Sequence, residues 1–310
     1  MYKYIIGRLL LMIPTLFLVI FLVFTILNVV PGDPARIMLG IEATQAEIDD
    51  FNQRFGLDQP FFVRFADYVV GIVTRFDFGN SFRTYRPVVD GILLRLSPTF
   101  RLAVFGIVTL VVLGVPLGVL AAIKRSTIID TSITVYAMFL SAIPGFWLGI
   151  LLLWFFGLVL GWLPTFGSAT WQHFILPVIA LAWPGSSGFI RLTRVLMLDT
   201  VNQEYVKTAR AKGCPEYSVI WKHAFKNAML PLINSAGLTF SGLLGGTVLI
   251  ESVFTINGLG SYIVTSIQSR DMPVVMGTTI FLASIFLFMV VLIDIIYAIV
   301  DPRIRAKFSR

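Results

Sequence analysis

The chain has 310 residues, of which 57% are hydrophobic and 13% charged, and its mean hydropathy is +0.86. Soluble domains usually have about 45–50% apolar and about 25% charged residues, so this composition excludes an ordinary soluble domain and a disordered chain. The net charge of +7 would suggest nucleic-acid binding in a soluble protein, but in a membrane protein basic residues set the orientation. The single cysteine, Cys214, excludes an intrachain disulfide framework.

Six apolar runs are long enough to cross a bilayer core of about 30 Å. The first covers residues 9–30, and the sequence after it lacks a small-residue cleavage site, which favours a retained anchor over a cleaved signal peptide. The others are predicted at 102–123, 133–160, 174–196, 227–250 and 272–293, the last continuing toward Val300. We expect Pro144 and Pro184 to kink the third and fourth helices.

The distribution of Lys and Arg predicts the orientation of these helices. Lys124 and Arg125 follow the second helix, the stretch 191–226 has seven basic against three acidic residues, and the tail is also basic. Short loops rich in Lys and Arg remain in the cytoplasm, so we expect these segments and both termini on that side.

The one long external segment, residues 31–101, has eight bases and nine acids and is too long to follow the short-loop rule. Thr44 and Glu47 have capping-box spacing for a short helix that Gly56 could close, and Pro60 suits the start of another. The apolar side chains of that second helix approximate one face; they are Phe61, Phe62, Phe65, Tyr68, Val69 and Ile72. This face could pack on the bundle, lie among lipid headgroups or contact a partner.

The search for catalytic motifs is mostly negative. No glycine is followed by lysine, so the phosphate-binding Walker sequence is absent. The triplet Asp77-Phe78-Gly79 lacks the other kinase motifs and is interpreted as a chance match. His173 and His223 are predicted on opposite sides of the membrane, so they cannot share a metal. We therefore expect neither a catalytic site nor a bound cofactor in this chain.

The cytoplasmic stretch 204–231 is the most informative segment. Gly213 and Pro215 predict a break between two short helices that lie across the membrane face. Its basic composition also fits a solvated loop that obeys the positive-inside rule. The apolar side chains there favour a protein contact; they are Val219, Ile220, Trp221 and Phe225.

At this point the sequence resembles a known family. Thr208-Ala-Arg-Ala-Lys-Gly213 followed by Lys226-Asn-Ala-Met-Leu-Pro231 is similar to the EAA loop in permease subunits of binding-protein-dependent ABC importers, in the dipeptide, oligopeptide and nickel branch. Further matching motifs are Pro31-Gly-Asp-Pro34, Phe55-Gly-Leu-Asp-Gln-Pro60, Asp77-Phe-Gly-Asn-Ser81, Gly161-Trp-Leu-Pro164, Glu251-Ser-Val-Phe254, Gly258-Leu-Gly260 and Asp301-Pro-Arg-Ile-Arg305. The resemblance covers nearly the whole chain.

The sequence departs from the family pattern at two places. Lys207 and Thr208 stand where the Glu and first Ala of the EAA motif belong, so Ala209 is the remaining match. Asn257 stands where many relatives have proline before Gly-Leu-Gly. The first departure is common in the peptide branch, and the second could alter an external turn.

The resemblance implies an all-α membrane protein with the type I ABC importer permease fold in a bacterial or archaeal plasma (inner) membrane. The expected parts are a first helix with its external segment (1–101), a core of five helices (102–302) with the EAA-like loop at 198–227, and a cytoplasmic tail (303–310). The implied partners are a second homologous permease, two ATPases that bind ATP and Mg, and an external solute-binding protein. Nucleic acid is not among them.

The resemblance also assigns roles to residues. The ATPase-coupling positions would be Ala209, Arg210, Gly213, Pro215, Tyr217, Val219 and Trp221. The fifth helix combines glycines with polar residues, which suits close packing and a solute path; its path candidates are Asn234, Ser235, Thr239 and Ser241. Asp294, on one helical face with Tyr297 and Asp301, should be paired or face water, and Arg191 and Arg194 are the candidate partners.

The function implied is ATP-driven import of solute delivered by the binding protein. Dipeptides, longer peptides, glutathione-like tripeptides and nickel chelates all occur as substrates in this branch, and the sequence does not select among them. Two other classes fit six helices without a catalytic cluster, a channel and a structural membrane scaffold, while a membrane enzyme fits poorly. An ATPase-docking loop distinguishes the importer from these alternatives.

Overall fold

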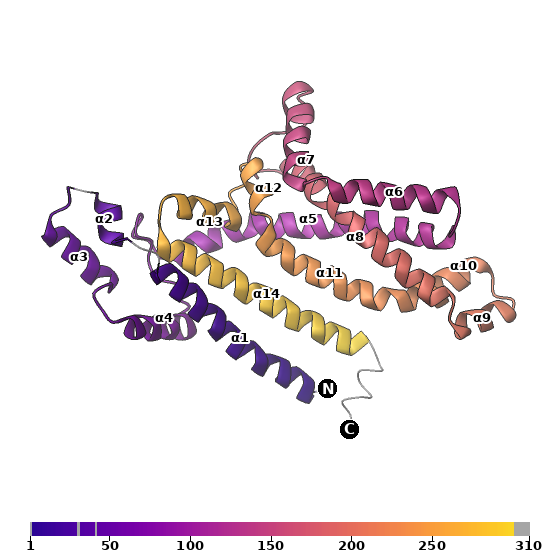
Figure 1. Ribbon diagram of the computed structural model, residues 1–310, viewed down its shortest axis with the longest axis horizontal. Coiled ribbons are helices and arrows are strands. Elements are labelled where there is room, and N and C mark those ends of the chain that lie inside the picture. Colours follow the sequence, from indigo (N-terminus) through magenta and orange to yellow (C-terminus); the bar gives the residue numbers. More distant parts are fainter. Residues whose placement is uncertain (1, 30–31, 41, 301–310) are drawn as a thin grey trace.

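The computed structural model describes residues 2–29, 32–40 and 42–300, and across these ranges the chain is built from helices (Figure 1). The N-terminal part contains α1 (Tyr2–Val29), α2 (Pro34–Leu39), α3 (Gln45–Phe55) and α4 (Phe61–Arg75). The middle contains α5 (Val88–Ile123), α6 (Ile128–Ala142), α7 (Gly145–Leu152), the π-helix η1 (Leu153–Val159), the 3-10 turn η2 (Trp171–Phe174) and α8 (Ile175–Val201). The remainder contains α9 (Glu204–Ala211), α10 (Glu216–Ser218), the π-helix η3 (Val219–Phe225), α11 (Lys226–Gly246), α12 (Val248–Val253), α13 (Leu259–Gln268) and α14 (Met272–Val300). Pro31, Asp301 and the tail 303–310 lie outside the described residues, as does the side chain of Tyr297.

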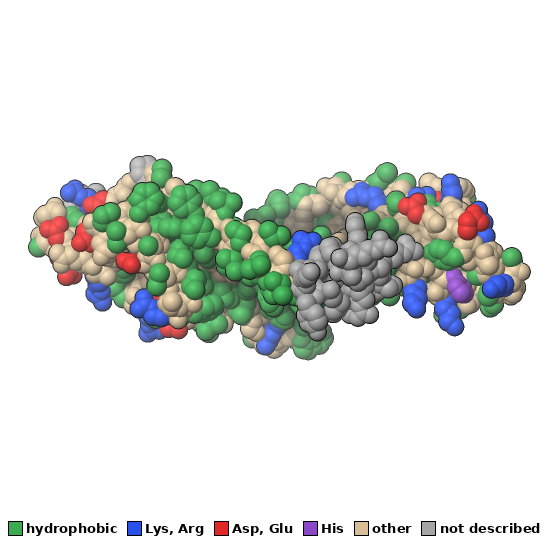
Figure 2. Space-filling view, turned by 90° about the horizontal axis from the view of Figure 1, so that it is seen from below, with side chains coloured by type: hydrophobic (Ala, Val, Ile, Leu, Met, Phe, Trp, Pro, Cys, Tyr) green, Lys and Arg blue, Asp and Glu red, His purple; other side chains and the backbone are tan. Residues whose placement is uncertain are grey.

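Five of the described helices are long and apolar enough to cross a membrane, and the number is six when the bent pair formed by α6 and the α7–η1 helix is counted as one span. In Figure 2 charged side chains gather toward the two ends of the long axis, with apolar side chains between them. This separation is the one a bilayer imposes, since charged groups avoid the hydrocarbon core. The predicted number of spans is confirmed on that count.

The prediction of one kinked helix over residues 133–160 was wrong, because the structure has two separate helices there. The chain turns by 89° between α6 and the α7–η1 helix. Pro144 cannot donate a backbone hydrogen bond, and it forces the preceding Ile143 out of the helical region to φ −90° and ψ 118°. Figure 1 shows α7 leaving the bundle almost perpendicular to α6. The proline therefore ends the helix where a kink was expected.

Two other helices differ from the predicted bounds. Helix α5 begins at Val88, well before the predicted start at residue 102, because the charged residues Asp90 and Arg95 continue the helix beyond its apolar part. Helix α11 follows η3 without a break and ends at Gly246, before the predicted end at residue 250. The apolar run was a correct guide to the membrane segment but not to the helix ends.

Helices α5 and α8 pack through glycine. A Cβ on Gly114 would lie 2.6 Å from Cβ of Phe189, and one on Gly118 would lie 2.5 Å from Cβ of Thr193. These separations are far below a van der Waals contact, so only glycine allows the two helices to approach this closely. Phe189 and Thr193 are buried in the seam. The pair forms the centre of the bundle.

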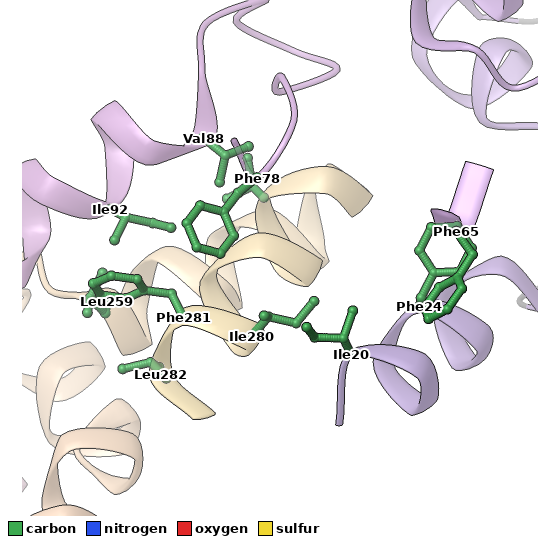
Figure 3. Packing of buried hydrophobic residues seen from close by; sticks show 11 residues of the cluster. Ile20, Phe24, Phe65, Phe78, Val88, Ile92, Leu259, Ile280, Phe281 and Leu282 are labelled. Carbon is green, nitrogen blue, oxygen red and sulfur yellow. The ribbon is translucent and has the colours of Figure 1, made fainter. Parts of the chain in front are cut away.

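The segment between α1 and α5 packs on the bundle. Phe65 of α4 is buried against α1, with its ring centroid 5.4 Å from those of Phe21 and Phe24 (Figure 3). Tyr68, Val69 and Ile72 pack against the same cluster, whereas Phe62 is 73% exposed. Of the three uses considered for this apolar face, packing on the bundle is the one found.

The triplet Asp77-Phe78-Gly79 has a structural role. Phe78 is buried in the same cluster, and Asp77 accepts the backbone N–H of Gly79 through Oδ1 at 2.8 Å. The loop then bonds to the buried Asp271 at the start of α14, which accepts the hydroxyl of Ser81 and, at 3.0 Å, the N–H of Phe82. This pair of hydrogen bonds fastens the external segment to the last membrane helix.

The predicted capping box at Thr44 is confirmed. Glu47 accepts the Thr44 N–H at 2.8 Å, and these hydrogen bonds lower the pKa of the Glu47 carboxyl. Gly56 ends the helix in the left-handed region at φ 63°. Pro60 is the residue directly before α4. Local capping rules were therefore sufficient to locate α3.

Gly118→Ala should destabilise the α5–α8 seam, because the added methyl group meets Thr193 and the carbonyl of Ile190. Overpacking of a tight interior costs about 1–3 kcal/mol, so the apparent Tm in detergent should fall by several degrees. Gly188→Ala is the matched control on α8, since a Cβ there has no heavy atom within 4 Å. Equal Tm values for the two variants would contradict close packing at Gly118.

Candidate functional site

The loop that follows α8 forms the short helix α9, a tight turn and then α10, and the predicted second short helix is instead the start of a continuous helix that includes Pro231. Gly213 adopts φ +79°, which confirms the predicted break, and its N–H bonds to the carbonyl of Arg210 at 2.9 Å. Pro215 then precedes α10, which continues through η3 into α11. This left-handed backbone conformation is unfavourable for residues other than glycine, and most of all for β-branched residues. The turn therefore depends on Gly213.

An ion pair bridges the turn. Arg210 of α9 donates to both carboxylate oxygens of Glu216, at 2.7 and 3.2 Å, in a bidentate geometry. The hydrogen bond to Glu216 raises the pKa of the Arg210 guanidinium. Bidentate pairs of this kind fix orientation more firmly than single contacts. Arg210 and Glu216 thus set the angle between the two helices.

The loop is anchored on the bundle by its small and branched side chains. Val206, Ala209 and Val219 are buried, and they pack with Val119 of α5 and Met197 of α8. Val219 and Ile220 were predicted to contact another protein, but the structure buries both within this chain. The apolar pattern at these two positions therefore indicates attachment to the bundle, and this corrects the prediction.

Aromatic side chains form the outer surface of the same loop. Tyr217 is 76% exposed and Trp221 is 40% exposed. Tyr217, Trp221 and Phe225 follow one another at four-residue spacing, with ring centroids 6.4 and 5.2 Å apart. Exposed aromatic rows are enriched at protein interfaces. Of the seven predicted coupling residues, Ala209 and Val219 are buried, and the other five are exposed; these are Arg210, Gly213, Pro215, Tyr217 and Trp221.

Helix α11 has two faces of different character. A Cβ on Gly237 would collide with Ile293 of α14, so this glycine permits helix packing. Gly242, Gly245 and Gly246 are exposed and have open space beside them. Packing, one of the two uses predicted for these glycines, is thus found at Gly237, while the other three lie on an open surface of the helix.

The four predicted path residues do not share one environment. Asn234, Ser235 and Thr239 are half-buried on α11. Ser241 is fully buried, and its hydroxyl donates to the carbonyl of Gly237 at 3.0 Å. Ser241 therefore faces the interior of this chain and cannot line an open path in this arrangement.

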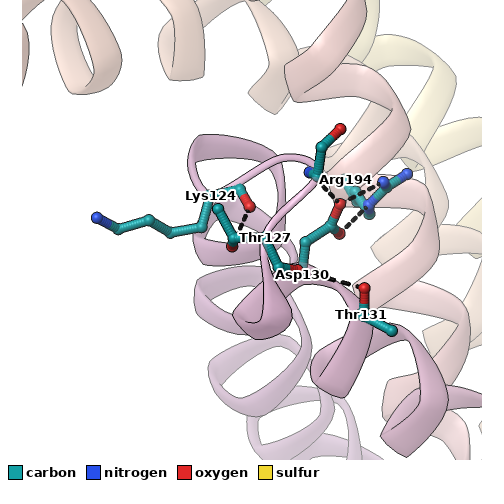
Figure 4. Close-up of polar contacts among 6 residues, drawn as sticks. Lys124, Thr127, Asp130, Thr131 and Arg194 are labelled. Atoms are coloured by element: carbon teal, nitrogen blue, oxygen red, sulfur yellow. Dashed lines mark hydrogen bonds and ion pairs between the residues drawn. The ribbon is translucent and has the colours of Figure 1, made fainter.

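The predicted partners of Asp294 were wrong. Asp294 forms an ion pair with Arg8 of α1, with the Arg8 Nε atom 3.2 Å from Oδ2. Arg194 instead pairs with Asp130 at the start of α6, at 2.6 and 2.8 Å (Figure 4), and Arg191 is exposed. Arg8 lies near the other end of the sequence, which is why spacing along α14 gave no indication of it.

Three buried carboxylates were not singled out as ionic or hydrogen-bonding centres by the sequence. Asp130, Glu251 and Asp271 are each at most 5% exposed. Asp130 comes immediately before the uncharged stretch 131–190, and Glu251 and Asp271 flank α13. A carboxylate at the edge of a membrane run is the signal that could have found them, because burial there requires donors.

The described residues offer binding surfaces and packed helices. Across 2–29, 32–40 and 42–300 no group of three His, Cys, Asp or Glu side chains lies close enough to hold a metal ion. The two features with functional character are the exposed aromatic row at Tyr217 and Trp221 and the open face of α11, which one continuous helical segment connects. The fold and these features define a multi-pass membrane protein with an exposed aromatic loop.

Comparisons with known proteins agree with this class. Residues 114–306 match the family described as "Binding-protein-dependent transport system inner membrane component", and residues 1–103 match the N-terminal part of such membrane components. The glutathione transport system permease protein GsiC of Escherichia coli strain K12 is 40% identical over 307 residues, covering 99% of this chain and 100% of GsiC. GsiC of Shigella dysenteriae serotype 1 has the same identity and coverage.

Solved structures show the same fold. The MetNI methionine ABC transporter in an inward-facing conformation superposes with a TM-score of 0.59 at 17% identity, covering 68% of this chain and 96% of that chain. A second crystal form gives a TM-score of 0.51. This chain belongs to the inner-membrane-component family of binding-protein-dependent transport systems, and it is a permease subunit of an ABC importer with the all-α type I fold. It is accordingly a multi-pass inner-membrane protein, as the sequence indicated.

Arg194→Gln should destabilise the chain because it leaves the Asp130 carboxylate buried without its cation. Breaking a fully buried ion pair lowers the free energy of unfolding by about 3–5 kcal/mol. Because the Arg194 side chain is 29% exposed, we expect this variant to lose about 2 kcal/mol. Adding Asp130→Asn should recover part of the lost Tm in detergent. An additive loss in the double variant would contradict a direct pair, and Arg191→Gln serves as the exposed control.

Proposed function

We propose that this permease imports small peptides, including glutathione-like tripeptides, delivered by an external binding protein. The observation that carries the proposal is the continuous helical segment from the exposed aromatic loop at Tyr217 to the open glycine face of α11. Through such a segment, a partner bound at the cytoplasmic loop could move the part of α11 that lies in the membrane. The identity of 40% with GsiC over nearly the whole chain supports the substrate class.

The proposed assembly has two permeases and two ATPases. ATP and Mg would bind on the ATPase subunits, since this chain lacks a Walker sequence and would be non-catalytic. The loop 198–227 would seat Arg210, Tyr217 and Trp221 on one ATPase, with Ala209, Gly213, Pro215 and Val219 maintaining its shape. A second, homologous permease would face the open side of α11.

The proposed solute path runs along α11. Asn234, Ser235 and Thr239 supply polar groups on a surface that is not fully buried in this chain, and the exposed glycines leave room beside them. Peptide groups need hydrogen-bond partners on a path through an apolar layer. These three residues would offer such partners, whereas Ser241 would not.

The proposed orientation has both termini and the loop 198–227 in the cytoplasm. It is supported by the basic residues of the short loops, among them Lys124 and Arg125. In this orientation α2, α3 and α4 cover the outer mouth and present a surface to the binding protein, while the tail 303–310 lies in the cytoplasm. The domain division 1–101, 102–302 and 303–310 is part of the same proposal.

Reconstitution tests the function directly. The chain, its second permease and the ATPases should be co-expressed, placed in liposomes and supplied with the binding protein and radiolabelled glutathione or dipeptide. We expect uptake that requires both ATP and the binding protein. Uptake by the single chain without nucleotide would support a channel instead, and a complex that transports only nickel chelates would contradict the peptide assignment.

Gly213→Val should uncouple the loop, because a β-branched side chain resists φ +79° and would displace α10 relative to α9. We expect stimulated ATPase activity of the assembled complex to fall about tenfold, equivalent to about 1.4 kcal/mol of coupling. Gly213→Asn is the matched control, since Asn tolerates the left-handed region. If both variants couple normally, the turn geometry does not transmit the signal.

A further inference from the structure

The buried carboxylate of Glu251 joins three elements at the outer end of the bundle. Its Oε1 atom accepts the hydroxyls of Thr99 on α5, at 2.7 Å, and of Thr247 before α12, at 2.9 Å. Its Oε2 atom accepts the backbone N–H of Ser261 in the first turn of α13, at 2.9 Å. Glu251 is 0% exposed and, within the described ranges, forms no salt bridge.

This arrangement is specific to a carboxylate. Three donors and the N-terminal end of α13 satisfy the charge, so its burial does not leave unpaired oxygen atoms. A Cβ on Gly258 would lie 2.5 Å from the carboxyl carbon, and one on Gly260 would lie 3.0 Å from Oε2. The backbone of the turn is thus fitted around Glu251, which explains why the two glycines follow it at this spacing.

Helix α5 also contacts the turn 251–262 through Arg95 and Gly91. Arg95 donates to the side-chain oxygen of Asn257 at 3.0 Å and lies over the ring of Tyr262 at 4.0 Å. Gly91, one helical turn before Arg95, provides the space that the Tyr262 ring occupies. Gly91, Arg95 and Thr99 are spaced by four residues and form one stripe along α5.

The Thr99 hydroxyl completes the stripe. Besides donating to Glu251, it accepts the backbone N–H of Leu259 at 2.8 Å. The turn 251–262 is therefore bonded to α5 through Thr99, through Glu251 and through Asn257. Asn257, which departs from the family's proline, contributes an amide oxygen that proline lacks.

A weak point lies immediately beside this anchored turn. The α11 helix ends at Gly246, and Thr247 separates it from α12. Gly245 and Gly246 are exposed, and an added Cβ would have no heavy atom within 4 Å at either, whereas the next residue, Thr247, is buried and bonded to Glu251. Glycine also lowers helix stability, by about 1 kcal/mol relative to alanine.

We propose that Glu251 is the positioning residue of the outer gate. It fixes Thr247 and the turn 251–262 to α5 as one rigid unit, so that movement of α11 bends the chain at Gly245–Gly246 and opens the path there. The proposal rests on the proposed import function, because it assigns the place where coupling from the cytoplasmic loop becomes a movement at the outer mouth.

Hydrogen exchange on the assembled complex tests the rigid unit without a transport assay. Amides of 258–262 should be equally protected in the nucleotide-free and the ATP-trapped complex, while those of 243–246 should differ between the two states. Glu251→Gln should raise exchange at 258–262 by about tenfold or more, since it removes the charge that strengthens these bonds. State-dependent exchange at 258–262 would overturn the fixed unit.

Uptake per ATP hydrolysed tests the role in coupling. Thr99→Val removes the shared hydroxyl and should lower this ratio about tenfold, whereas Thr99→Ser keeps the hydroxyl and should restore it. Thr278→Val is the matched control, because the Thr278 hydroxyl on α14 is equally buried but has no hydrogen-bond partner. An equal loss in Thr278→Val, or no loss in Thr99→Val, would overturn the proposal.

Different results would contradict the import function and the role of Glu251. If the unmodified complex shows no uptake driven by ATP and the binding protein, the proposed function is wrong. If it does transport peptide and Thr99→Val transports it equally well per ATP, only the role of the Glu251 anchor is wrong. If Glu251→Gln does not assemble, the Thr99 pair and the exchange of the unmodified complex still decide.

Discussion

The close contact between α5 and α8 is the constraint on which the arrangement of the other helices depends. Gly114 and Gly118 bring the two backbones together, and this contact places Thr193 and Phe189 in the buried seam. In a bilayer the hydrophobic effect does not hold helices together, so close packing of this kind supplies the attraction. The loop that contains α9 is anchored on this pair through Val119 and Met197, and the turn 251–262 is anchored on α5 through Thr99.

Helix α11 differs from this fixed pair. It packs against α14 through Gly237, but its opposite surface, with Gly242 and Gly245, has no neighbour among the described residues. One end continues from the aromatic loop, and the other ends at the glycine pair beside the anchored turn. In the proposed import function, this helix, with its exposed small-residue face and its terminal glycines, is the element that would move against the α5–α8 pair. The contacts of α11 are consistent with such a movement in an importer permease.

The membrane segments and the local turns could be predicted from the sequence because they depend on neighbouring residues. Apolar runs located the spans, Thr44 and Glu47 located a helix start, and Gly213 located a turn. Pro144 was recognised but underestimated, since it moves Ile143 out of the helical region and α7 then packs in a new direction, with Gly149 and Leu152 buried against α8 and α12.

Long-range polar pairs could not be predicted in the same way. Asp294 pairs with Arg8 and Glu251 with Thr99, and both partners lie on helices that only the fold brings near. The surface or buried role of a loop residue also depends on the fold: Val219 and Trp221 have similar apolar character, yet one is buried and the other is exposed. The class of protein followed from ordered motifs, whereas the role of each side chain required the structure.

The most direct test of this account is a pair of distance measurements by electron spin resonance on the complete complex in a Cys214→Ser background. One label pair would join Leu94 on α5 to Ile267 on α13, and the other would join Leu94 to Leu238 on α11; all three side chains are exposed. The account predicts that the Leu94–Ile267 distance is the same in the nucleotide-free and ATP-trapped states, while the Leu94–Leu238 distance changes. A change in the first distance with none in the second would contradict it.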